Sequence, residues 1–251
     1  MKTFNISLFL LMVFLNCSAQ ENAIFRNSFF STGFSQVKEA ANFGLVFNGP
    51  AINYGMKWDR RNDKRMITYE FEIGVGIPFS KNIPALDIYI KPIDIAYMFR
   101  FNGLPGKLWI GPEFKFEYYY TIYPQLQSGF DYWFTNFSLG LNAHYAFNYK
   151  KSGFQIMLNT SLAGLTSRQP DYRDPYFFDI GFKHAVRHLH QDMIFASLVK
   201  YNAATLEILW KPEQNSRFSF GYQFRFSGYY QSPEFKKVSH SIMILFSKKN
   251  K

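Results

Sequence analysis

The chain has 251 residues and a net charge of +10, and 18% of its residues are charged, against about 25% in ordinary soluble domains. Aromatic residues make up 20% of the chain, with 30 Phe and 17 Tyr, which is a high share even for a soluble β protein. After the N-terminus no run of about 20 apolar residues occurs, which excludes a helical membrane protein.

The first 20 residues, MKTFNISLFLLMVFLNCSAQ, have the pattern of a secretory signal peptide. A lysine precedes an apolar core from Ser7 to Leu15, and small residues lead to a predicted cleavage after Gln20. The apolar core is too short for a membrane anchor. Cys17, the only cysteine, is an alternative lipid-attachment site, and cleavage after Gln20 leaves the domain 21–251 without a thiol. We therefore expect an exported protein with no nucleic-acid partner.

Segments of alternating apolar and polar residues follow, each bounded by turn residues. We predict ten strands, at 23–35, 44–60, 65–79, 88–102, 107–119, 132–149, 153–165, 195–211, 215–229 and 238–248. Alternate side chains of an extended chain point to opposite faces, so each strand has one apolar face. The stretch 176–199 fits either a helix or a strand hairpin, and a hairpin would raise the count to twelve.

The clearest alternation lies in Arg217–Tyr230, RFSFGYQFRFSGYY. Five aromatic residues take every second position, and we expect them to face lipid: Phe218, Phe220, Tyr222, Phe224 and Phe226. The positions between them are polar, charged or glycine, and we expect these to face an enclosed interior.

Short and long connections between the predicted strands alternate strictly. The short ones are 61–64, 102–106, 150–153 and 212–216, and the long ones are 36–43, 80–86, 121–131, 164–192 and 228–237. This alternation is typical of an antiparallel transmembrane β-barrel with tight periplasmic turns and long outward loops. It also places both chain ends in the periplasm. A soluble β-sandwich would alternate too, but it would require neither such dense aromatic faces nor the two classes of connection.

Aromatic residues also gather where membrane interfaces are expected. Trp58 and Trp210 precede short turns, and tyrosines adjoin long loops. With the signal peptide, the alternation in GPAINYGMKW and GPEFKFEYYY and a last strand closing on Phe246, the chain resembles the small outer-membrane β-barrel proteins of Gram-negative bacteria over nearly all of 21–248. The resemblance implies insertion by the outer-membrane assembly machinery, and it carries over no catalytic residues.

The predicted interior faces collect charged residues. They are Lys57, Glu70, Glu72, Asp94, Arg100, Glu113, Lys115, Glu117, Glu207, Arg217 and Arg225. A barrel of about ten strands has a narrow lumen, and buried charges must be paired, so we expect a salt-bridge network that closes the pore. A narrow polar channel is the alternative. Glu113 and Glu117 are spaced like an acid–base pair, but Lys115 between them favours ion pairing.

Three histidines, His184, His188 and His190, form a candidate metal site. On a helix His184 and His188 would lie one turn apart, but the Glu of H-E-x-x-H is missing. The His-x-Ser dyad of outer-membrane lipid hydrolases is absent, and no local motif matches the Asp and His residues of omptin proteases. We assign no catalytic residue and no cofactor.

The sequence thus predicts a porin-like barrel in the cell outer membrane with a structural, interaction or accessory role. The alternatives are a channel or transporter for small polar solutes and a surface hydrolase of lipid or protein. Expected partners are outer-membrane lipids, lipopolysaccharide, the assembly machinery and a protein that binds loops 121–131 and 164–192.

Overall fold

A computed structural model describes residues 23–40, 44–124, 131–168, 189–213, 216–232 and 234–250. The predicted signal peptide, His184, His188 and most of the loops 121–131 and 164–192 lie outside these described residues. Within them, no helix has the length and apolarity needed to cross a membrane.

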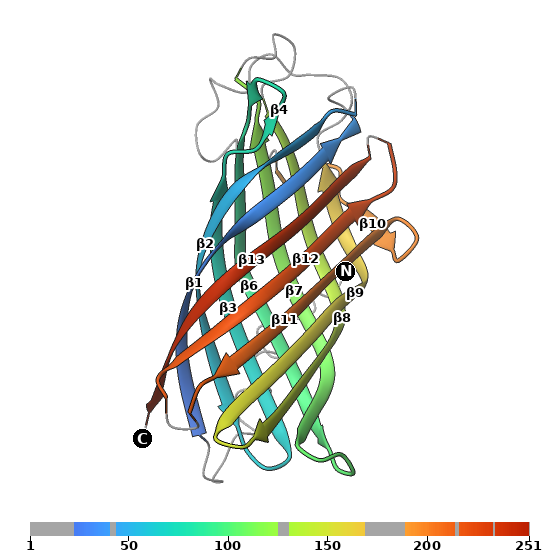
Figure 1. The fold of residues 1–251 in the computed structure, drawn as a ribbon. Helices are drawn as coiled ribbons and strands as arrows, with labels where there is room; N and C mark the ends of the chain where they lie inside the picture. Colours follow the sequence, from blue (N-terminus) through green and yellow to red (C-terminus); the bar gives the residue numbers. More distant parts are fainter. Residues whose placement is uncertain are drawn as a thin grey trace, which may run out of the picture.

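Ten long antiparallel strands form a closed barrel (Figure 1). They are β1 (Ala23–Glu39), β2 (Val46–Arg61), β3 (Arg65–Gly76), β6 (Leu86–Phe101), β7 (Lys107–Ile122), β8 (Asp131–Tyr149), β9 (Ser152–Arg168), β11 (Tyr201–Lys211), β12 (Phe218–Tyr229) and β13 (Phe235–Asn250). The barrel closes because β1 pairs with both β2 and β13. The predicted all-β antiparallel barrel is therefore confirmed. The short turns lie at one end, with the start of β1 and the end of β13, at the bottom of Figure 1.

Three short strands lie outside this ring. β4 (Phe79–Ser80) and β5 (Ile83–Pro84) form a small hairpin beside β2, and β10 (Ile194–Ser197) pairs with the upper part of β9. β11 pairs directly with the lower part of β9, so no further hairpin stands between them in the wall. The count is thus ten, and the twelve-stranded alternative is wrong.

The single strand predicted at 195–211 is wrong in one respect, because a turn divides it into β10 and β11. Ala163 of β9 is paired with Ser197, but Thr160 is already paired with Ala204. The chain leaves the sheet between these two pairs, where the Lys200 N–H donates to the Ser197 carbonyl at 2.9 Å. The segment contains no Gly or Pro, so its residues carry no clear sign of this turn.

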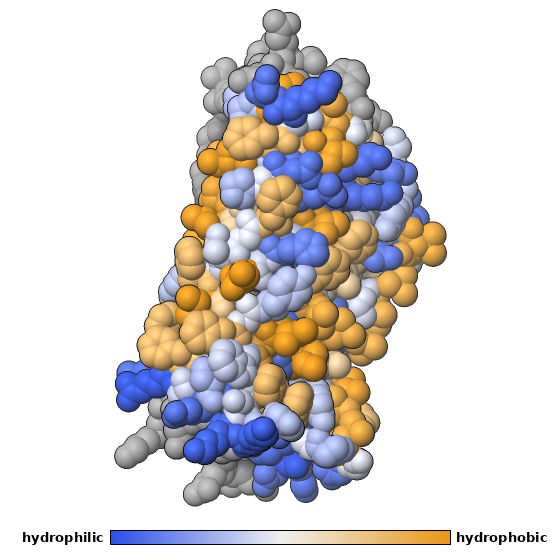
Figure 2. Space-filling view, in the orientation of Figure 1, coloured by the Kyte–Doolittle hydropathy of each residue, from blue (hydrophilic) through white to orange (hydrophobic). Residues whose placement is uncertain are grey.

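The outer surface is rich in apolar side chains. Phe220, Ile244 and Ile73 are 43%, 39% and 43% exposed, whereas Ser219 and the residues on either side of Ile244 and Ile73 are buried. Figure 2 shows apolar side chains over much of one side of the barrel, with hydrophilic groups near the bottom and among the apolar ones in the upper half. The five aromatic residues of β12 predicted to face lipid all lie on this outer face, with Phe224 and Phe226 more covered than the other three.

A bulge in β6 changes which residues point inward. Ile90 and Ile93 of β6 are paired with Tyr118 and Phe116 of β7, so β6 carries one extra residue between those two pairs. The extra residue lies beside Pro92, which cannot donate a ladder hydrogen bond and is therefore confined to edges and bulges within sheets. Alternation is shifted by one position there, and Lys91 and Asp94 both become buried in the interior.

Candidate functional site in the barrel interior

Lys91 lies at the centre of the charged interior. Its Nζ lies 2.6 Å from Glu70 Oε1, 3.1 Å from Asp94 Oδ2 and 3.5 Å from Glu72 Oε2. The three carboxylates, two on β3 and one on β6, surround the ammonium group of Lys91. Because none of these groups is open to bulk water, each charge is stabilised by its neighbours rather than by solvent.

Arg225 connects this cluster to the opposite wall. Its guanidinium lies 2.9 and 2.7 Å from the two carboxylate oxygens of Glu72 and 3.0 Å from Gln223 Oε1. The same guanidinium lies 4.5 Å from the centroid of the Tyr89 ring, within the range of a cation–π contact. These contacts therefore reach from β12 across the lumen to β3 and β6.

Two further lysines extend the network toward β7 and β9. Lys57 lies 3.8 Å from Glu70 and donates to the Met157 sulfur at 2.8 Å. Lys115 lies 3.4 Å from Glu113 and donates to Asn159 Oδ1 at 2.9 Å. Each ammonium thus has one carboxylate and one neutral acceptor.

Above this layer the lumen is filled by hydrogen-bonded and aromatic side chains. Glu117 accepts from the Tyr89 hydroxyl at 2.8 Å and from Asn136 at 3.3 Å. A buried apolar cluster adjoins them, formed by Val37, Tyr89, Tyr119, Phe134, Ala196, Tyr201, Ala203, Tyr229 and Phe235. Its rings pack face to face or tilted, as Phe134 does on Phe235 at 5.6 Å between centroids. This layer leaves the upper lumen packed with side chains.

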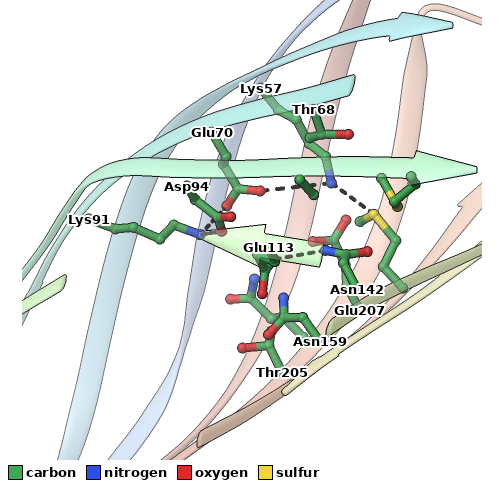
Figure 3. Close-up of a pocket in the computed structure, with 14 residues that line it drawn as sticks. Lys57, Thr68, Glu70, Lys91, Asp94, Glu113, Asn142, Asn159, Thr205 and Glu207 are labelled. Carbon is green, nitrogen blue, oxygen red and sulfur yellow. Dashed lines mark hydrogen bonds and ion pairs between the residues drawn. The ribbon is translucent and has the colours of Figure 1, made fainter. Parts of the chain in front are cut away.

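Little space remains among the central side chains. The cavity bounded by Lys57, Lys91, Glu113 and Glu207 has a volume of about 20 Å³, which is room for about one water molecule (Figure 3). Figure 3 shows the charged and amide groups pointing into it from several strands. The middle of the barrel is therefore closed by side chains.

Comparison with known proteins assigns the chain to no family. No protein-family model and no curated protein matches the chain. Among solved structures the barrel is similar to the outer membrane protease OmpT from Escherichia coli, at 8% identity over 91% of this chain and 96% of that one, with a TM-score of 0.44. It is also similar to the translocator domain of the autotransporter NalP from Neisseria meningitidis, at 8% identity over 96% and 93%, with a TM-score of 0.42. An outer membrane channel from Pseudomonas putida F1 matches at 8% identity over 92% and 97%, with a TM-score of 0.37.

The closed antiparallel barrel with its apolar outer surface is the architecture of outer-membrane β-barrel proteins. Because no protein-family model and no curated protein matches, the role of this chain must be argued from its own side chains.

The residues predicted for the lumen are almost all brought together. Lys57, Glu70, Glu72, Asp94, Glu113, Lys115, Glu117, Glu207 and Arg225 all lie in the covered interior. Arg100 instead lies near the mouth at the short-turn end, with 28% of its side chain exposed. Arg217 is exposed and is not part of the network, because β12 begins only at Phe218 and Arg217 belongs to the preceding turn.

The sequence pattern missed Lys91 and two ion pairs at the upper end. Asp87 pairs with Lys237, and Glu39 pairs with Arg168. These four residues lie just beyond the predicted strand ends, because charged residues at the ends were interpreted as loops. Lys91 was missed because strict alternation places it outside, and Pro92 in the middle of a strand was the available signal of the bulge.

His190 is the only described member of the predicted histidine cluster. Its Nε2 lies 2.7 Å from the Tyr118 hydroxyl, and its ring lies against Phe116 and Phe137 on the outer face of the wall. Among the described residues no group of three or more His, Cys, Asp or Glu could hold a metal ion. The predicted metal site stays a prediction, because His184 and His188 lie outside the described residues.

Proposed function

We propose that the chain is an integral outer-membrane β-barrel protein whose lumen is sealed, and that its role is structural, accessory or one of interaction rather than transport. The observation that carries this proposal is the filled centre of the barrel. Only about 20 Å³ is open among Lys57, Lys91, Glu113 and Glu207, and a hydrated solute requires a continuous path.

The apolar outer surface supports a position within a lipid bilayer. The outward residues run from Ile67 in β3 to Ile77, just after its end, which is roughly 33 Å along an extended chain. At a strand tilt of about 40°, this corresponds to roughly 25 Å along the barrel axis, the height of the apolar band of outer-membrane barrels. Secretion with the predicted signal peptide and insertion by the assembly machinery are consistent with that position.

Because no solute passes through a sealed barrel, its outer wall and its loops are the surfaces at which it can interact with other molecules. In the proposed orientation the long connections face outward and the short turns face the periplasm. Outer-membrane lipids and lipopolysaccharide cover the wall, and the loops 121–131 and 164–192 are the proposed surface for a protein partner.

Conductance in planar bilayers tests the sealed lumen. We expect the folded wild-type barrel to give no stable current steps, because the central side chains leave no connected water path. A variant with both Glu72→Ala and Arg225→Ala removes one of several barriers, and we expect brief current events without a stable open state, because the aromatic layer above and the Asp59 contacts below remain. Tyr222→Ala, on the outer face of β12, is the control and should give no current steps. Stable open-channel steps from the wild-type protein would exclude the proposal.

A further inference from the structure

A large open vestibule lies at the short-turn end of the barrel, below the charged network. It has a volume of about 960 Å³ and is lined by the ends of β1, β2, β6, β7, β8, β9 and β11. This size is near the upper end of the usual range for small-molecule sites, about 300–1,000 Å³. The space is therefore adequate for an organic molecule with a body larger than a single ion.

The lining of this vestibule is strongly basic. Arg61, Arg100, Lys107 and Lys211 all contribute to it. Asp63 is the carboxylate among the lining residues, and its side chain is fully exposed and 4.0 Å from Arg100. Converging cations in a recess with low-dielectric walls raise the local concentration of anions.

Several donors of the lining residues have no acceptor within the part of the chain that the structure describes. They are the Nε groups of Arg61 and Arg100 and the indole Nε1 of Trp109. Trp109 is only 3% exposed, so its donor cannot be satisfied by open solvent as a surface group would be. These covered atoms do not face the open vestibule, so the charged ends of Arg100 and Lys107 are the groups that can contact a ligand there.

Aromatic surface lies beside these cations. The Arg61 guanidinium lies 5.3 Å from the Phe25 ring and 5.9 Å from the Trp109 ring. Trp109 is in turn stacked on His144, 5.5 Å between centroids, which fixes the plane of the indole. The vestibule thus combines a flat apolar surface with positive charge.

The inner end of the vestibule is blocked. Asp59 accepts from Arg61 at 2.7 Å, from Asn27 at 3.3 Å and from Thr68 at 3.1 Å, and these four side chains come from three adjacent strands. A smaller space of about 70 Å³ adjoins the vestibule and shares Phe25, Arg61, Gln155 and Lys211 with it. This space and the 20 Å³ cavity of the charged centre are too small for an organic molecule, so a molecule that enters from the short-turn end stops there.

We propose that this vestibule is a binding site for a small organic anion, in which a phosphate or carboxylate group contacts Arg100 and Lys107 and an aromatic or other apolar body lies against Phe25. This inference concerns a site outside the sealed centre. It holds or fails independently of the conductance result.

Titration calorimetry with phenyl phosphate on the folded, detergent-solubilised full barrel tests the proposal. We expect saturable binding of one molecule per chain, weakened by high salt because the contacts are electrostatic. Inorganic phosphate should bind about tenfold more weakly, since it lacks the apolar body, and neutral benzyl alcohol should not bind measurably.

Two matched double variants locate the site. Arg100→Gln with Lys107→Gln removes two charges from the vestibule and should weaken phenyl phosphate binding by about tenfold or more. Lys38→Gln with Lys236→Gln removes the same charge from the opposite end and should leave it unchanged. Heat-modifiable gel migration confirms that both variants are folded. Equal affinities of the two double variants would overturn the site, and inorganic phosphate binding as tightly as phenyl phosphate would overturn the ligand class. No detectable heat of binding with phenyl phosphate would overturn both the site and the ligand class.

Discussion

Arg225 and Glu72 face each other across the lumen, and the guanidinium donates to both carboxylate oxygens at 2.9 and 2.7 Å. The two residues are 153 positions apart, on β12 and β3, which are not neighbours in the sheet. The contact therefore depends on closure of the barrel rather than on local strand pairing. It links two walls through a charge-assisted pair, the strongest class of hydrogen bond between side chains.

Replacing only one residue of this pair should destabilise the barrel strongly. Arg225→Met leaves the fully buried Glu72 without its cross-lumen partner, and we expect the free energy of unfolding to fall by about 3–5 kcal/mol. The double variant, Arg225→Met with Glu72→Met, removes both charges and should recover much of that loss. Denaturant unfolding in micelles measures each variant. A double variant as unstable as the sum of the single variants would show that the two residues are not coupled.

Lys91 should matter more than Lys57, although both are buried lysines of the interior. Lys91 contacts three carboxylates within 3.5 Å, whereas Lys57 has one at 3.8 Å. We expect Lys91→Met to destabilise the barrel by about 2 kcal/mol more than Lys57→Met, because it leaves more buried negative charge uncompensated. Unfolding midpoints of the two variants check the order. The reverse order would contradict the central position assigned to Lys91.

Replacing Glu207, unlike the residues above, should destabilise the barrel only slightly. Its Oε1 atom has no hydrogen-bond partner among the described residues although the side chain is buried. Glu207→Gln removes a charge that costs desolvation without a direct ion pair, so we expect a loss of less than about 1 kcal/mol. Glu72→Gln, which disrupts the pair with Arg225, should cost several times more. Equal losses in the free energy of unfolding for Glu207→Gln and Glu72→Gln would indicate that the network stabilises the Glu207 charge.

Gly111 on β7 tests the packing of the wall itself. A Cβ atom at this position would clash with the Tyr97 carbonyl oxygen and with Met98 Cα on the adjacent strand β6, and both are backbone atoms that cannot move aside cheaply. We therefore expect Gly111→Ala to reduce the fraction of heat-modifiable, folded barrel. Gly153→Ala is the control, because its Cβ would meet no atom closer than 3.5 Å. Normal folding of Gly111→Ala would contradict the close approach of β6 and β7.

Strand alternation, dense aromatic faces and the two classes of connection together predicted the barrel, because a period of two separates the inner from the outer face without any knowledge of strand partners. It failed where that period is interrupted. The bulge at Pro92 moved Lys91 inward, and charged strand ends such as Asp87 and Lys237 were assigned to loops. Which inward charges meet cannot be predicted from the pattern, since Arg225 and Glu72 come together only through the closure of the whole sheet.

The direct test of the account is nitroxide accessibility along β12. Spin labels are placed one at a time at Ser219, Phe220, Tyr222 and Gln223 of the barrel in lipid vesicles, and relaxation is measured with oxygen, which partitions into lipid, and with a water-soluble nickel chelate. We predict high oxygen accessibility at Phe220 and Tyr222, and low accessibility to both reagents at Ser219 and Gln223, whose side chains are buried inside. Oxygen accessibility that does not alternate between these positions, or a nickel chelate that reaches Gln223 freely, would contradict a sealed barrel with its aromatic rows in lipid.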